Sequence, residues 1–111
     1  MDNIITFEDF TKVDMRIGTI IEVNDFPEAR RPAYQLKIDF GDLGVKKTSA
    51  QITSLYSTSE LLQKQVVAVV NFPKKQIGPF MSECLLLGAV DGREVIVLNP
   101  EIRVENGLTV A

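Results

Sequence analysis

Alternation of apolar and polar side chains constrains this chain more than any other feature of its sequence. From residue 34 to residue 40, a large apolar side chain occupies every second position and a polar one each position between. This period of two is that of a β-strand with one buried face. A similar pattern runs from Met15 to Val23, but Thr19 and Ile20 break it, so we expect that strand to bend near Gly18.

Four further segments have the character of strands. Segments 45–52, 83–90 and 93–98 are short and lie next to turn residues, whereas 65–71 is a nearly continuous Val/Ala run. Such a run is typical of a strand that is buried on both faces. The dipeptide Asp91-Gly92 separates the last two segments and predicts a type I′ hairpin turn.

Two capping motifs predict short helices. Ser57 and Glu60 have the spacing of a capping box, which predicts one helix at about 57–63. Thr6 and Asp9 form a weaker motif of the same kind, which predicts a single helical turn before the first strand.

The order of these elements predicts the fold. Three strands, one short helix and further strands are typical of the oligonucleotide/oligosaccharide-binding (OB) fold, whose ligands contact the second and third strands and two flanking loops. An immunoglobulin-like sandwich would need more strands and no such helix. We therefore expect one all-β domain over 1–111, a five-stranded Greek-key OB barrel with a helix between strands three and four. Proline-bearing stretches 25–32 and 72–80 are expected to be loops, and 1–12 and 98–111 to be terminal extensions.

Length and composition narrow the class of protein. With 111 residues, 45% of them hydrophobic, the chain can bury a core without disulfides or metal. The longest apolar run, Val66 to Val70, is far too short to span a bilayer, so we expect no membrane insertion. The first ten residues carry acidic side chains and no basic region, which predicts no signal peptide. The single Cys84 suits a reducing compartment, so we expect a cytoplasmic protein.

The chain offers little for catalysis. It has no histidine, which removes the commonest general base and the commonest metal ligand. Cys84 lies next to three leucines and is expected to be an unreactive thiol of the core, and acidic pairs such as Glu8-Asp9 are expected to be solvated. No glycine-rich phosphate loop occurs. We expect a protein that is not an enzyme, with no catalytic residue, metal or cofactor.

Three basic doublets mark the predicted binding face. The formal net charge is −3, so any nucleic-acid site must be a local patch. Arg30-Arg31, Lys46-Lys47 and Lys74-Lys75 fall in the loop after the first strand, on the third strand and in the loop after the fourth. These are the elements that line the binding face of an OB-fold.

Aromatic side chains lie close to these doublets in the sequence. Phe26, Phe72 and Phe80 stand in or beside proline-bearing loops and are expected to be partly exposed. Nucleic-acid bases stack on such rings beside cations, and apolar peptide side chains could dock on them equally well. Alternatively, the rings cover the ends of the barrel or a subunit interface.

Several stretches resemble the CsaA family of bacterial secretion-chaperone-like proteins, and the likeness covers essentially the whole chain. The stretches are Asp14–Gly18 through Phe40-Gly41, Pro27–Arg30, Ser49–Thr53, and Val66–Pro73 through Met81–Glu83. The resemblance implies an OB-fold, a homodimer built with the N- and C-terminal extensions, and the binding of unfolded or exported polypeptide.

The CsaA family is similar to the tRNA-binding domains at the C-terminus of methionyl-tRNA synthetases and to free-standing tRNA-binding proteins. Those relatives carry a Pro-x-Ala-Asp-Lys-Leu loop, of which Pro27 and Ala29 match whereas 30–32 differ. They also carry a Ser-x-Gly-Met turn, of which Ser82 matches whereas 84–85 differ. These departures and the acidic net charge favour polypeptide as the ligand, while the basic doublets favour tRNA.

We therefore predict a CsaA-like chaperone for unfolded or presecretory polypeptides, with a tRNA-binding module as the alternative. The residues predicted to bind peptide are Phe26, Tyr34, Phe72, Phe80 and Met81. Those predicted to bind tRNA are Arg30, Arg31, Lys46, Asn71, Lys74, Lys75 and Ser82.

Overall fold

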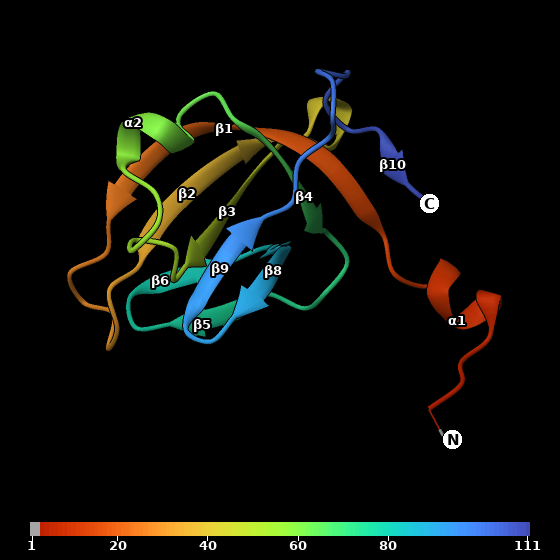
Figure 1. Cartoon of the computed structure of the whole chain (residues 1–111), viewed down its shortest axis with the longest axis horizontal. Helices are drawn as coiled ribbons and strands as arrows, with labels where there is room; N and C mark the ends of the chain where they lie inside the picture. The colour runs from red at the N-terminus through yellow and green to blue at the C-terminus, as the bar shows by residue number, and fades with distance from the viewer. Residues whose placement is uncertain (1–2) are drawn as a thin grey trace.

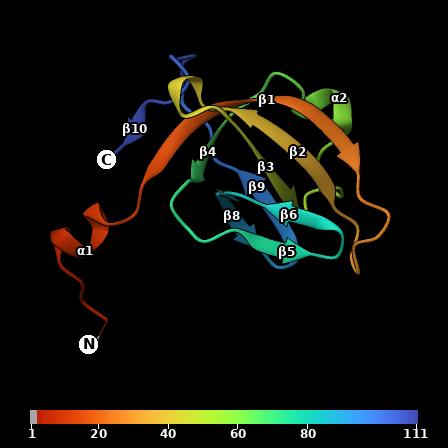
Figure 2. The same ribbon diagram turned by 180° about the vertical axis from the view of Figure 1, so that it is seen from behind.

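The long strand β1 (Met15–Asp25) organises the computed structural model, which describes residues 3–111. β1 pairs antiparallel with β2 (Tyr34–Asp39) along one edge and with β4 (Gln65–Val69) along the other. The short C-terminal β10 (Thr109–Val110) continues the β2 edge by pairing with the start of β1. Figures 1 and 2 show β1 and β2 arching together over the smaller strands.

The sheet curls until its two outer strands approach each other. Its order is β3-β2-β1-β4-β7, where β3 is Val45–Ala50 and β7 is Leu85–Leu86. Beyond the ladder, the N–H of Glu83 donates to the carbonyl oxygen of Lys47 at 2.7 Å and brings β3 against the segment that leads into β7. The result is a nearly closed all-β barrel, which confirms the predicted OB-fold.

The alternating pattern that predicted the strands corresponds to the core. Leu36, Ile38 and Phe40 are almost fully buried, and all five residues of β4 are buried, as expected from its Val/Ala run. The core also includes Ile20 from β1 and Leu61 from the short helix between β3 and β4. One apolar interior therefore joins both halves of the chain.

Both predicted helices form, with the predicted caps. α2 (Thr58–Leu61) lies between β3 and β4, and Ser57 and Glu60 form the full capping box. The helix is shorter than the predicted 57–63 because Gln63 adopts a φ of 71°, a left-handed conformation that ends it. α1 (Phe7–Thr11) also has a full capping box and projects from the barrel as an arm (Figures 1 and 2).

Two predictions about the second half of the chain are wrong. Segment 72–80 is not a plain loop, because β5 (Lys75–Ile77) and β6 (Phe80–Ser82) form a hairpin there. The turn between them is Gly78-Pro79, and Gly78 has a φ of 56°, which permits the tight reversal. The strand expected at 83–90 is divided into two separate strands, β7 and β8.

The last hairpin has a different turn from the one predicted. β8 (Gly88–Asp91) pairs with β9 (Glu94–Val97), and Asp91 lies opposite Glu94. The two loop residues are therefore Gly92 and Arg93, not Asp91-Gly92. Gly92 is the first loop residue and has a φ of 62°, as in a type II′ turn. The predicted type I′ turn is therefore wrong, and the loop lies one residue later than predicted.

A buried polar network explains why Thr19 breaks the strand pattern. Thr19 is buried, and its hydroxyl donates to the side-chain oxygen of Asn106 at 2.7 Å. The Gln65 side chain donates to the carbonyl oxygen of Val104 at 2.7 Å and accepts from the N–H of Val104 at 2.9 Å. The pairing register of β1 with β2 shifts between Ile20 and Glu22, beyond Gly18, where the bend was expected. The C-terminal tail is thus fastened along its own barrel.

Within the described residues 3–111, no helix is long and apolar enough to cross a membrane.

Candidate ligand-binding groove

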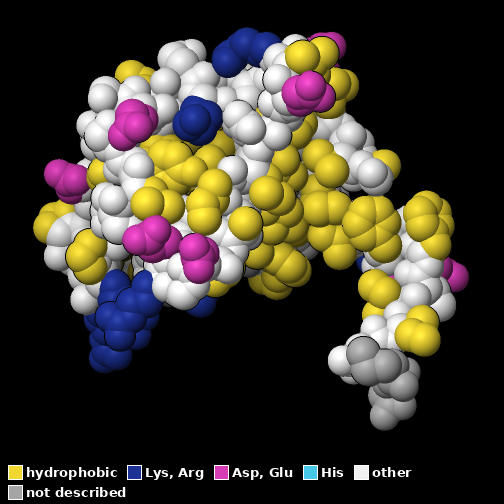
Figure 3. Space-filling view, in the orientation of Figure 1, with side chains coloured by type: hydrophobic (Ala, Val, Ile, Leu, Met, Phe, Trp, Pro, Cys, Tyr) yellow, Lys and Arg dark blue, Asp and Glu magenta, His cyan; other side chains and the backbone are white. Residues whose placement is uncertain are grey.

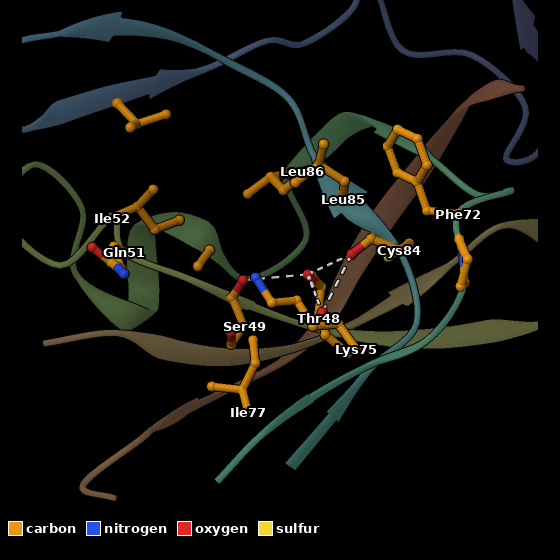
Figure 4. A pocket seen from close by; sticks show the side chains of 14 residues that line it. Thr48, Ser49, Gln51, Ile52, Phe72, Lys75, Ile77, Cys84, Leu85 and Leu86 are labelled. Atoms are coloured by element: carbon orange, nitrogen blue, oxygen red, sulfur yellow. Dashed lines mark hydrogen bonds between the residues drawn. The ribbon is translucent and has the colours of Figure 1, made fainter. Parts of the chain in front are cut away.

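A groove of about 540 Å³ lies between the third strand and the hairpin that follows the fourth. We call it the apolar groove, and Figure 4 shows its lining. β3 and the residues after it form one wall, and β5, β7 and β9 supply apolar side chains to the other. Its lining includes Thr48, Ser49, Gln51, Ile52, Phe72, Lys75, Ile77, Ser82, Cys84, Leu86 and Val95.

Hydrogen bonds around Thr48 hold the inner end of the groove together. The Thr48 hydroxyl, which is buried, donates to the carbonyl oxygen of Cys84 at 2.8 Å and lies 3.1 Å from the hydroxyl of Ser82. Burial raises the pKa of the Cys84 thiol to about 12. The thiol is therefore uncharged and unreactive at neutral pH, which confirms the prediction of a core cysteine.

Glu83 fixes the distance between the walls. Its carboxylate accepts from the N–H of Lys47 at 2.9 Å and lies 3.5 Å from the ammonium of Lys74. The hydrogen bond from Lys47, assisted by the charge of Lys74, holds the pKa of Glu83 below its usual range. Glu83 was not predicted as a site residue, because no local sequence pattern marks a carboxylate that closes a barrel.

A second cavity of about 490 Å³ extends the groove toward the loop between β1 and β2. Ser49, Gln51 and Ile77 line both cavities, so the two lie next to each other. The second cavity is also lined by Arg30 and Arg31, and we call it the cationic end. In Figure 3, Lys and Arg side chains gather where Figure 1 places this loop.

The structure separates the aromatic residues that the sequence grouped together. Phe72 is 52% exposed and lines the apolar groove. Phe26 is only 3% exposed, so the expectation of partial exposure is wrong for this ring. The Phe26 ring packs against the half-buried Phe80 ring at 5.4 Å, and the Lys47 ammonium lies 5.3 Å from the Phe80 centroid. Phe26 and Phe80 therefore stabilise the loop between β1 and β2.

The other two predicted peptide contacts also lie outside the apolar groove. Tyr34 is buried, and its hydroxyl donates to the carbonyl oxygen of Tyr56 at 2.8 Å. With Phe26, it lines a separate hollow of about 280 Å³. Met81 is half-buried on β6, opposite Gln76, and is not a lining residue of the groove.

Of the predicted tRNA contacts, three exposed cations surround the groove. Arg30, Arg31 and Lys75 are exposed and line one cavity or the other. Lys74 forms the ion pair with Glu83, and Lys46 is half-buried on β3. Arg30 and Arg31 therefore lie together at the cationic end, whereas Lys75 lines the apolar groove.

Asn71 and Ser82 form hydrogen bonds within the chain, although Asn71 is also exposed. The Asn71 amide donates to the carbonyl oxygen of Lys12 at 2.7 Å, and its oxygen accepts from the N–H of Asp14 at 3.0 Å. Ser82 is joined to Thr48, as described above. Both side chains therefore stabilise the fold of the chain itself.

Much of the apolar lining was not predicted from the sequence, including Ile52, Ile77, Leu86 and Val95. Ile77 and Lys75 lie on the same side of β5, separated by Gln76, and this three-residue strand is too short to show a pattern in the sequence. Within residues 3–111, no group of three or more His, Cys, Asp and Glu side chains could hold a metal ion. The groove is therefore suited to binding an apolar, extended ligand that carries negative charge at one end.

Apolar side chains are also exposed on the arm and on the barrel beside it. On the arm, Ile4, Ile5 and Phe7 are each at least two-thirds exposed. Figure 3 shows a broad hydrophobic surface on the part of the barrel that faces the arm. Ile102 and Leu108 of the C-terminal tail are exposed as well. Apolar surface on this scale is typical of an interface with another molecule.

Comparison with known proteins identifies one matching family and several similar structures. Residues 15–109 match the family described as "Putative tRNA binding domain". The structure is similar to the chaperone CsaA of Bacillus anthracis (TM-score 0.93, 47% identity, 97% of this chain and 99% of that one). It is also similar to the CsaA chaperone protein of Picrophilus torridus (TM-score 0.92, 53% identity, 97% of this chain and 100% of that one).

A curated relative is much longer than this chain. The methionine–tRNA ligase of Thermococcus kodakarensis is 40% identical over 103 residues, which are 93% of this chain. The match spans only 14% of that ligase.

Proposed function

This chain belongs to the tRNA-binding domain family, two of its full-length structural neighbours are CsaA chaperones, and we propose that it binds extended segments of other polypeptides. The predicted resemblance to CsaA is confirmed. Unfolded chains, including proteins awaiting export, are the proposed clients, and the cytoplasm is the proposed place of the encounter. Catalysis forms no part of the proposal.

The apolar groove is the observation that carries this proposal. It is large enough for several side chains and is lined by Ile52, Ile77 and Leu86. Burying one Val or Leu side chain contributes about 1.5–3 kcal/mol. Folded proteins keep such side chains in their cores, so a site of this kind favours unfolded chains.

We also propose a homodimer. The arm carries exposed Ile4, Ile5 and Phe7, and two copies could cover this surface in a symmetric pair. Residues 1–2 of the predicted interface lie outside the described residues. Because the tail from Val104 onward is fastened to its own barrel, the arm and the exposed Ile102 are the parts of the extensions best placed to meet a partner.

Binding of tRNA is the second candidate, and the cationic end supports it. Arg30, Arg31 and Lys75 are exposed beside the groove, and the ring of Phe72 could stack on a base. The acidic net charge opposes this candidate, since phosphate neutralisation supplies most of the affinity of general nucleic-acid binders.

Two ligands and three variants distinguish the candidates. The ligands are an alkylated protein that stays unfolded in buffer and a folded tRNA, each titrated at low and moderate salt. Ile77→Ser removes apolar lining, and Val90→Ser is the control because Val90 is 74% exposed and outside the groove. We expect Ile77→Ser to weaken polypeptide binding about tenfold, with little salt dependence and no effect of Val90→Ser.

The opposite pattern would assign the tRNA function. In that case the double variant Arg30→Ala/Arg31→Ala should reduce tRNA affinity and lower the salt slope by about one per lost phosphate contact. The polypeptide proposal fails if tRNA binds at physiological salt, this double variant abolishes that binding, and the unfolded protein shows no saturable binding.

A further inference from the structure

Along the outer edge of β3, the backbone of Lys47 is hydrogen-bonded, whereas that of Ser49, the next residue that faces outward, is open. The N–H of Phe40 donates to the carbonyl oxygen of Gly44 at 3.0 Å, and the β2–β3 register continues from that pair. Hydrogen-bonded pairs alternate along an antiparallel ladder, so the backbone groups of Lys47 and Ser49 both point away from β2. Lys47 agrees with this, because both of its backbone groups bond to Glu83.

The backbone of Ser49 has no comparable partner. Among residues 3–111, nothing in the structure accepts a hydrogen bond from its N–H. Its carbonyl oxygen lies 3.3 Å from the Thr48 hydroxyl, but that group has one hydrogen, which goes to Cys84 at the shorter distance of 2.8 Å. Ser49 thus presents a donor and an acceptor at the point where the apolar groove meets the cationic end.

We propose that this Ser49 edge pairs with the backbone of a bound polypeptide, which adds a short strand beside β3. The inference rests on the proposed polypeptide function and specifies how the ligand is held. An unpaired strand edge is a template for a further strand, and backbone bonds to such an edge do not depend on the ligand's sequence. One site could therefore accept many clients.

The residues that line the two cavities determine which ligand side chains they can accept. Alternate residues of a strand point to the same side and are separated by about 6.6–6.8 Å. A residue facing inward would enter the apolar groove toward Ile77 and Leu86. Farther along, the ligand reaches Arg30 and Arg31, opposed by only one lining acid, Glu28, so an acidic residue or terminal carboxylate fits there. The occupant is an extended peptide of alternating apolar residues with negative charge at one end.

A peptide fits this edge better than a nucleic acid does. A peptide residue supplies both an acceptor for the Ser49 N–H and a donor for its carbonyl oxygen. Phosphate groups supply acceptors only, so a nucleic acid would have to place a base amino group or a ribose 2′-hydroxyl beside the carbonyl oxygen.

Ser49→Pro tests the inference, with Ser49→Ala as its matched control. Proline removes the N–H that faces the groove but no bond of the β2–β3 ladder, and edge strands tolerate proline at such positions. The probe is a nine-residue peptide with valine alternating with serine and a glutamate at one end. We expect Ser49→Pro to weaken binding about fivefold and Ser49→Ala to change it less than twofold.

Wild-type measurements keep the test independent of how well the proline variant folds. Peptide binding should slow hydrogen exchange of the Ser49 amide, and N-methylation of the peptide at alternate residues should weaken binding. The inference is overturned if the unfolded protein binds in an Ile77-dependent manner while the peptide leaves the Ser49 amide unprotected and N-methylation has no effect. That outcome leaves the proposed function intact. Protection of the Ser49 amide by tRNA instead of peptide also overturns the inference.

Discussion

The side-chain amide of Asn71 donates to the carbonyl oxygen of Lys12 at 2.7 Å, across 59 positions of sequence. The same amide accepts from the N–H of Asp14 at 3.0 Å, so one side chain holds the link between α1 and β1 on both sides. This contact sets the direction in which the arm leaves the barrel. The position of the apolar arm, and the dimer proposed from it, therefore depend on a residue of the segment after β4.

Asn71→Ala should release the arm. Loss of both hydrogen bonds should lower the free energy of unfolding by about 1–2 kcal/mol and speed hydrogen exchange at Asp14. The proposed dimer should dissociate at a higher concentration, as measured by light scattering. Asn71→Asp retains the acceptor for the Asp14 N–H and loses only the donor, so it should have the smaller effect on exchange. Equal exchange in the wild type and Asn71→Ala would show that Asn71 does not hold the arm.

Much of the barrel could be predicted because its signals are local. The alternation around Leu36 and the capping box at Ser57 each depend on residues within one element. The hairpin after β4 was missed because Pro73 and Pro79 suggested a loop, whereas Pro79 stands in the turn itself. Thr19 was misleading for another reason, since its partner Asn106 lies 87 positions away.

The groove was only partly predictable because it is made of segments distant in sequence. The sequence placed Arg30-Arg31 and Lys75 near a common face, and both line the groove region. It could not distinguish the buried Phe26 from the exposed Phe72, because both are phenylalanines next to prolines. Burial of a loop residue depends on what packs over it, and Phe26 packs against Phe80 of a hairpin that was not predicted.

Ionisation of the Cys84 thiol should lower the stability of the protein in alkali. Burial raises its pKa from 9.0 to about 12, so the unfolded chain ionises first. Its contribution to stability is fully present below pH 9 and declines by about 1.4 kcal/mol per pH unit between pH 9 and 12. Cys84→Ala, which cannot ionise, should lack this component when urea unfolding is compared at pH 8 and pH 10. Parallel decline of the two proteins would contradict the prediction.

Protonation of the Glu83 carboxylate should lower the stability of the protein in acid. The hydrogen bond from the Lys47 N–H is the main reason why its pKa lies below the usual 4.5. A lowered pKa gives stability that is present above pH 4.5 and is lost as the pH falls below it. Glu83→Gln keeps an acceptor for Lys47 without the charge, so its urea midpoint should fall less than that of the wild type between pH 6 and pH 3. If both midpoints fall equally, other carboxylates govern the acid transition.

Gly18 leaves no room for a side chain at the centre of β1. A Cβ there would lie 2.6 Å from a methyl group of Ile38 and 2.8 Å from the ring of Phe40, both of which are fully buried. Gly18→Ala should therefore lower the free energy of unfolding by about 1–3 kcal/mol, because the core must shift to accept the extra carbon. Urea titration measures the change. Phe40→Leu removes ring atoms from this contact, so the double variant Gly18→Ala/Phe40→Leu should be more stable than the sum of the single effects predicts by at least about 0.5 kcal/mol. Strict additivity would mean that the two positions do not compete for space.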